Sequence, residues 1–156
     1  MITIEIRDSA VQQALRNIGQ RVADMSPVMR AIGVEMLSET EGNFQYQGRP
    51  KWMGLASRTI EQRTRKGSWP GMILQREGDL AGAVRVESDS NSMTLGVLDE
   101  IKYAAIHQFG GMAGRGRKVK IPARPYMPFD INGNLTDTMH NEVLSIASDY
   151  LRKVIG

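Results

Sequence analysis

The segment from residue 83 to residue 97 restricts the fold more than any other part of this sequence. It contains two short runs in which every second residue is apolar, separated by the polar, turn-forming segment 89–92. Side chains on a β-strand alternate between its two faces, so each run exposes one face and buries the other. The pattern therefore predicts an antiparallel β-hairpin, which needs a covering layer from elsewhere in the chain. The apolar positions are Val84, Val86, Met93, Leu95 and Val97.

Helices are the expected source of that layer. Apolar residues recur at spacings of three and four in three long segments, which is the periodicity of an amphipathic helix. These helices are expected at about 9–24, 27–41 and 136–154. Shorter helices are expected at 58–66 and 103–109, and further strands at 2–6 and 117–121. The sum predicts an α+β fold, in which a small antiparallel sheet of three to five strands packs against the N-terminal helices and the long C-terminal helix.

The length of 156 residues suits a single domain with a buried core. We expect one domain across residues 1–156. It consists of a helical part at about 1–44, a basic loop and hairpin part at about 45–135, and the C-terminal helix at about 136–154.

Several classes of function are excluded by what the sequence lacks. Without cysteine there are no disulfides, thiolate nucleophiles or thiolate metal sites. No apolar run approaches the roughly 18 residues that span a bilayer, and segment 1–7 has a charge inside its apolar stretch, unlike a secretory signal. Neither a Gly-Lys-Ser/Thr phosphate loop nor a Gly-x-Ser-x-Gly elbow occurs. We expect a protein made in the cytoplasm, with no membrane contact, metal, cofactor or catalytic residue.

Charge is distributed unevenly along the chain. Segment 43–76 holds seven Lys or Arg against Glu61 alone, and segment 101–129 holds six Lys or Arg and no acidic residue. Segment 77–100, between them, has a net charge of −5. A folded chain with this distribution has basic and acidic faces, which steer an acidic partner, a polyanion or a second copy of the same chain.

The glycine-rich basic segment Gly110–Lys120 has the strongest functional character. Four glycines between residues 110 and 116 predict a flexible tip. A mobile cationic loop orders when it contacts another protein subunit, or it lies beside nucleic acid and binds phosphate without reading sequence. A solvated surface loop is the third interpretation. The cations are Arg115, Arg117, Lys118 and Lys120, with Arg124 nearby.

The next segment is stiffened by Pro122, Pro125 and Pro128, which keep the backbone extended. We expect a rigid arm that holds Arg124 in place for a bidentate contact with a carboxylate. The alternative is an edge strand that leads into the last helix. In the first interpretation, the arm and the glycine-rich loop take their fixed shape by docking on neighbouring protein.

His107 and the two tryptophans each have a structural and a functional interpretation. His107 and Phe109 lie where a short helix is expected to end, which favours a structural role for the imidazole near the helix C-terminus. A catalytic or metal role needs a partner, and neither histidine has one at a ligand spacing. Trp52 and Trp69 flank the basic helix, and we expect them to hold loops on the core. Base stacking is the alternative.

Several motifs of the chain occur in a recognisable order. They are Lys51-Trp52, Leu55-Ala56-Ser57, Ile73-Leu74-Gln75, Gly78-Asp79-Leu80, YAAIHQFG at 103–110 and IPARPYMPF at 121–129. Over about residues 25–155 this series resembles the phage virion morphogenesis family, the group of P2-like tail-completion and Mu-like G proteins. The sequence departs from the family pattern at Met53-Gly54, where a proline-containing stretch is expected.

The resemblance implies a structural protein of the virion tail or neck, which completes the tail or joins it to the head. It implies copies that associate as a ring, partners among the tail, neck and head-connector proteins, and no cofactor. If six copies form the ring, their basic loops would lie near the DNA channel. The expected contact segments are Gly110–Lys120, Ile121–Phe129 and Gln45–Ser57. The expected contact residues are Trp52, His107, Phe109, Arg115, Arg117, Lys118, Lys120, Arg124, Tyr126 and Phe129.

Two other functions compete with this one. A nucleic-acid-binding module would use the basic segments 49–76 and 115–124, and its affinity for DNA would fall steeply with salt. A hydrolase would use His107 together with a carboxylate, which requires the two groups to meet in a cleft.

Overall fold

The computed structural model describes residues 5–155. Its helices are α1 (Ser9–Gly19), α2 (Ser26–Tyr46), α3 (Ser57–Arg65), α4 (Asp79–Gly82), α5 (Ala104–Phe109) and α6 (Asp137–Ile155), with a 3-10 turn η1 (Arg115–Arg117). Its strands are β1 (Val84–Ser88), β2 (Met93–Val97), β3 (Gly111–Ala113) and β4 (Val119–Ile121). The α+β class and the long C-terminal helix are as predicted.

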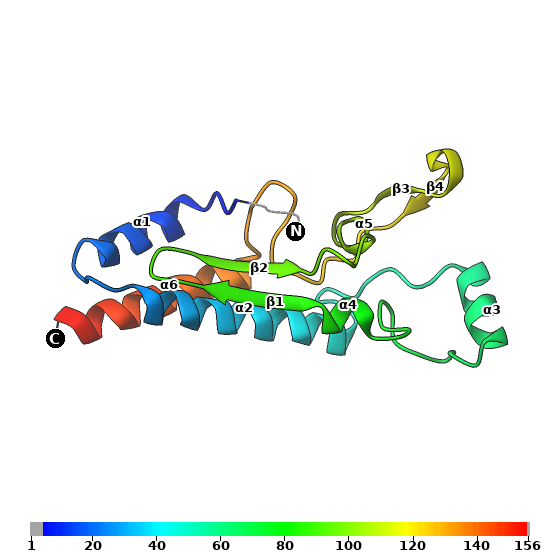
Figure 1. Cartoon of the computed structure of the whole chain (residues 1–156), viewed down its shortest axis with the longest axis horizontal. Coiled ribbons are helices and arrows are strands. Elements are labelled where there is room, and N and C mark those ends of the chain that lie inside the picture. The colour runs from blue at the N-terminus through cyan, green and yellow to red at the C-terminus, as the bar shows by residue number, and fades with distance from the viewer. Residues whose placement is uncertain (1–4, 156) are drawn as a thin grey trace.

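The β1–β2 hairpin lies along α2, and α6 lies against another face of α2 (Figure 1). The predicted pairing is confirmed, with Val84 opposite Val97 and Ser88 opposite Met93 in an antiparallel register. Helix and hairpin approach closely at Gly33, where an added Cβ would lie only 2.6 Å from Cγ1 of Val86. The core therefore forms between one helix layer and one face of the hairpin.

The predicted single sheet of three to five strands does not form among the described residues. Strands β1 and β2 make one two-stranded sheet, and β3 and β4 make a second. The two hairpins are separated because α5 and then Gly110, at φ +74° and ψ 179°, redirect the chain. Most of the strand predicted at 2–6 lies outside the described residues, and Glu5 and Ile6 belong to no strand.

Two helix ends differ from the prediction. The first helix ends at Gly19 rather than near 24. The second continues through Gly42 to Tyr46, because Asn43 and Phe44 extend its buried face. It ends where Gln47 turns left-handed at φ 55°, and the N–H of Gly48 bonds to the carbonyl of Asn43 at 2.8 Å. This geometry closes the helix with bonds typical of a left-handed C-terminal cap.

The first and last helices are tied together by Asp8. One carboxylate oxygen accepts a 3.1 Å bond from the N–H of Val11 and caps α1. The other oxygen pairs with Nδ1 of His140 on α6. The helices at the two ends of the chain therefore pack side by side.

Two parts of the chain project from one end of the molecule, beyond the C-terminal end of α2 (Figure 1). One is α3 with its flanking loops, and the other is the β3–β4 hairpin. The glycine-rich segment at 110–116, predicted as a flexible tip, belongs to a hairpin in which Met112 pairs with Lys120 and Ala113 with Val119. Gly114 and Gly116, both at positive φ, form its turn instead.

Candidate functional site

The proline-rich arm, residues 122–129, is held by the side chain of Gln108 on α5. Its Oε1 accepts hydrogen bonds of 2.9 Å from the N–H groups of both Tyr126 and Met127. Its Nε2 donates to the carbonyls of Met127 at 3.1 Å and Phe129 at 2.8 Å. Gln108 is 1% exposed, so these bonds form away from water and are costly to lose. One buried amide thus takes the place of a neighbouring strand for the arm.

Tyr126 is the most deeply placed residue of the arm. Its hydroxyl donates a 3.0 Å bond to the carbonyl of Ala104, and its own carbonyl accepts a 3.1 Å bond from the amide of Asn43. Its ring lies 5.2 Å from that of Phe44, and the residue has no exposed surface. Burial raises the pKa of the Tyr126 phenol, so it remains a protonated donor.

Trp52 connects the loop after α2 to the same arm. Its indole N–H donates a 2.9 Å bond to the carbonyl of Pro125, and its ring meets that of Phe44 edge-on at 6.1 Å. The side chain is 9% exposed. A ring used in this way is not free to stack on a nucleic-acid base.

Arg124 binds backbone carbonyls rather than the predicted carboxylate. Its Nε donates to the carbonyl of Met53 and its Nη2 to that of Gly54, both at 2.9 Å. The residue is 6% exposed, and burial, followed by the charge of Arg63, lowers the pKa of its guanidinium. The planar fork of arginine suits two adjacent carbonyls that no regular element uses. The arm is therefore fixed by its own chain, and docking on a neighbouring protein is not needed to shape it.

His107 lies beside this arm without a carboxylate partner among residues 5–155. Its backbone carbonyl accepts a 2.7 Å bond from the N–H of Arg124, and its ring meets Tyr103 edge-on at 5.7 Å. Its Nδ1 is buried and has no hydrogen-bond partner. Burial and then the nearby Arg124 lower the pKa of the imidazole. The described part of the chain brings no three His, Asp or Glu side chains together as a metal site.

The β3–β4 hairpin contrasts with the arm, because its side chains are turned to solvent. Met112 is 48% exposed and Val119 54% exposed. All four predicted cations of the hairpin are exposed, namely Arg115, Arg117, Lys118 and Lys120. Phe109, half-buried, stands at its base. Of the ten predicted contact residues, four are thus exposed on the hairpin, His107 and Phe109 are half-buried at its base, and the other four are buried in and around the arm, namely Trp52, Arg124, Tyr126 and Phe129.

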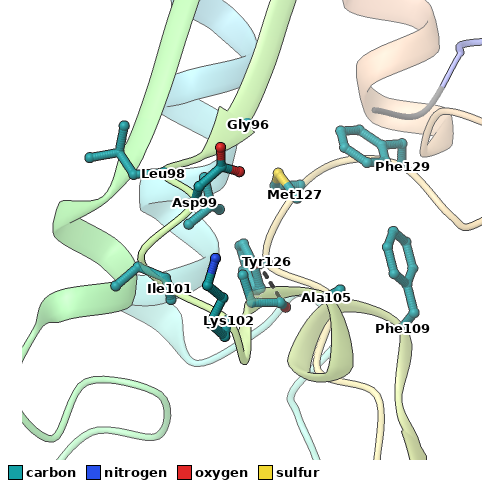
Figure 2. Close-up of a pocket in the computed structure, with 12 residues that line it drawn as sticks. Gly96, Leu98, Asp99, Ile101, Lys102, Ala105, Phe109, Tyr126, Met127 and Phe129 are labelled. Carbon is teal, nitrogen blue, oxygen red and sulfur yellow. Dashed lines mark hydrogen bonds between the residues drawn. The ribbon is translucent and has the colours of Figure 1, made fainter. Parts of the chain in front are cut away.

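A cavity of about 220 Å³ opens between the end of β2, the connection 98–102, α5 and the arm. Figure 2 shows Leu98, Asp99 and Lys102 on one side of it, with Met127 and Phe129 on the other. Its walls include the aromatic rings of Phe109, Tyr126 and Phe129. Neither this cavity nor the Gln108 bonds were predicted, since no local pattern in a sequence marks a single buried glutamine.

None of the helices between residues 5 and 155 has the length and the apolar character of a membrane span.

The comparisons with known proteins agree with each other. A sequence model described as the phage virion morphogenesis family matches residues 6–152. The chain is 36% identical to Mu-like prophage FluMu G protein 2 of Haemophilus influenzae over 156 residues, 99% of each chain. It is 31% identical over 137 residues to putative capsid assembly protein G of Escherichia phage Mu, 85% of each chain. No solved structure gives a significant match.

Proposed function

The chain belongs to the phage virion morphogenesis family, and on that premise we propose that it is a structural protein that completes the tail or joins it to the head. The relatives' names refer to a prophage G protein and to putative capsid assembly. In this proposal the chain is not an enzyme and uses no cofactor. Its partners are copies of itself and other proteins of the tail, neck or head connector.

The projecting hairpin is the observation that carries the proposal. It places four cations and two apolar side chains in solvent, on a base that Gln108 and the buried arm hold rigid. Met112 and Val119 lie on opposite faces of the hairpin, so each face offers one apolar side chain close to cations for contact with another protein. A rigid base lowers the conformational cost of binding, because only side chains need to be ordered.

The distribution of charge supports association between copies. The hairpin is cationic, whereas Glu77, Asp79, Glu87 and Glu100 are exposed on or beside the β1–β2 sheet. A contact between two unlike surfaces of one chain is heterologous, and it forms a closed ring when the rotation between copies permits closure. Such a ring is a suitable shape for the tail end or the neck.

Charge removal on the hairpin tests the proposed function. Arg115, Arg117 and Lys118 are changed together to Gln in the phage or prophage that encodes the chain. The matched control changes Arg58 and Arg65 of α3 and Lys66, which directly follows the helix, also two arginines and one lysine, all exposed. We expect the hairpin variant to lower the yield of complete particles at least tenfold, with unjoined heads or tails visible by electron microscopy. Normal particles in a strain that lacks the chain altogether would overturn the proposal.

A further inference from the structure

The β3–β4 hairpin is a narrow two-stranded ribbon that projects from the body of the molecule (Figure 1). Within the described chain its strands pack mainly on each other and on η1, and all residues from 111 to 120 except Ala113 are exposed. The major groove of duplex DNA, about 12 Å wide, admits a two-stranded β-ribbon. An element enters such a groove only if its own chain does not surround it, and the hairpin meets this condition.

The hairpin carries four cations and no acidic residue. Arg115, Arg117 and Lys118 lie within four consecutive residues at the turn, and Lys120 follows on β4. All four are exposed, and between residues 5 and 155 none of them forms an ion pair. Arg117 has φ +50°, a conformation that glycine adopts at lower cost, so the residue type is explained by its side chain and not by its backbone.

The neighbouring parts of the chain do not neutralise these cations. No Asp or Glu occurs between residues 101 and 129, and the nearest acidic residues along the chain are Glu100 and Asp130. The other projecting part is α3 with the residue that follows it. It exposes three cations against one acid, Glu61, which pairs with Arg65 at 4.0 Å. The two projections together carry an excess of positive charge, which attracts a polyanion.

The arrangement of the hairpin cations favours nucleic acid over an acidic protein surface. Duplex DNA carries one negative charge for about every 1.7 Å of its axis. Phosphates are therefore within reach of each cation, wherever its side chain lies on the ribbon. A protein surface would have to place a carboxylate opposite each of the four cations, which is a much stricter requirement.

The composition of the hairpin also favours duplex DNA over other nucleic acids. Single strands are bound through aromatic side chains on which the bases stack, and segment 110–121 contains no aromatic residue. Double-stranded RNA has a deep and narrow major groove that side chains do not reach. The segment also lacks Asn and Gln, the amide side chains that recognise adenine, so we expect little dependence on base sequence.

We propose that the tip of the hairpin, residues 115–118, enters the major groove of duplex DNA and binds the phosphates on its two sides, with Lys120 as a further phosphate contact. The inference goes beyond the proposed function, because it adds a DNA contact to the protein contacts assigned there and does not depend on them. Phosphate contacts make the affinity independent of sequence and strongly dependent on salt.

Fluorescence anisotropy with a labelled DNA duplex of mixed sequence measures the affinity of the purified full chain. Four phosphate contacts predict a slope of log K against log salt of about −3.6, at about −0.9 for each phosphate. In the tip variant, Arg115, Arg117 and Lys118 are changed together to Gln. Its slope should be about −0.9, and its affinity at about 50 mM salt should be lower by about tenfold or more. Circular dichroism verifies that the variant folds.

The matched control removes the same charge from the opposite end of the molecule. Arg16, Arg21 and Lys153 are exposed and belong to or follow α1 and α6, whose C-terminal ends lie far from the hairpin (Figure 1). Changed together to Gln, they should alter the DNA affinity less than about twofold, because salt at about 0.1 M screens charges beyond about 10 Å. Equal losses in the two variants would show that net charge alone drives binding, and the tip would not be the site.

Two other polyanions separate DNA from competing partners. Polyglutamate presents carboxylates, as an acidic protein does, and vesicles of phosphatidylserine present anionic groups on a lipid surface. Both should bind the wild-type chain more weakly than the duplex does. Tighter binding to either of them, or to single-stranded DNA, would overturn the inference, and so would the absence of duplex binding at about 50 mM salt.

The failure of this inference differs from the failure of the proposed function. The DNA measurement uses the purified chain, with no other virion protein present. A chain that does not bind DNA overturns the inference and leaves the family role in place. If the chain binds DNA through the tip but particles form normally without it, the inference stands and the proposed function is wrong.

Discussion

Oε1 of Gln108 lies 2.9 Å from the backbone nitrogen of Tyr126, and this contact fixes the position of the proline-rich arm against α5. The β3–β4 hairpin leaves the same C-terminal end of α5, two residues further on, through Gly110. The buried arm and the exposed hairpin therefore share one support. Sequence patterns alone do not separate the predicted contact residues into two groups. In the structure, some of them build the support formed by α5 and the arm, and others are exposed on the hairpin that the support carries.

Gln108→Leu keeps most of the side-chain volume but removes all four hydrogen bonds to the arm. The N–H groups and carbonyls left unpaired in the interior should lower the free energy of unfolding by about 3 kcal/mol. Urea denaturation followed by circular dichroism measures the change. The same substitution at Gln62, exposed on α3, should cost well under 1 kcal/mol. Equal effects at the two sites would contradict the role assigned to Gln108.

Arg124→Lys keeps the positive charge but replaces the two-pronged guanidinium with a single ammonium. One of the carbonyls of Met53 and Gly54 should lose its partner, at a cost of about 1–2 kcal/mol. Hydrogen exchange in segment 52–56 should become faster. Arg115→Lys, on the exposed hairpin, should change neither quantity. Unchanged exchange in Arg124→Lys would mean that the loop is held by other contacts.

His107 makes stability depend on pH. Its folded-state pKa lies below the ordinary value of 6.5, because burial and then Arg124 disfavour the charged imidazole. As the pH falls, the imidazole of the unfolded chain therefore takes up a proton before that of the folded chain. The contribution of His107 to the free energy of unfolding is thus complete above about pH 6.5 and declines below it. The decline stops once the folded-state pKa is reached. His107→Phe should remove this part of the pH dependence in urea titrations between pH 7 and pH 5. If the free energy of unfolding of His107→Phe fell with pH as steeply as that of the wild-type chain, the effect would belong to another titrating group.

Gly110→Ala should disturb the junction between α5 and the hairpin. Gly110 has φ +74° and ψ 179°, a region that only glycine commonly occupies, and an added Cβ would lie 2.9 Å from the backbone nitrogen of Ala123. We expect a loss of about 2–3 kcal/mol, measured by thermal and urea unfolding. Gly82→Ala, where an added Cβ meets nothing within 4 Å, is the control. A neutral Gly110→Ala would show that the hairpin base adapts without strain.

The sequence determined on its own the elements that depend on neighbours a few residues away. The β1–β2 hairpin, the three long helices and the α+β class all follow from local periodicity. The same local patterns were insufficient at helix ends. Whether α2 stops at Gly42 or continues to Tyr46 depends on what covers Asn43 and Phe44.

Only the tertiary structure decided which polar groups meet in the interior. Arg124 and Met53 are 71 residues apart in the chain, and Asn43 and Tyr126 are 83 apart. A buried donor must find an acceptor because leaving it unpaired is costly, but many acceptors in the chain would satisfy it equally well. Packing selects one of them. For that reason an arginine predicted to bind a carboxylate instead holds a loop of its own chain, and the exposed cations between residues 103 and 129 all lie on the hairpin.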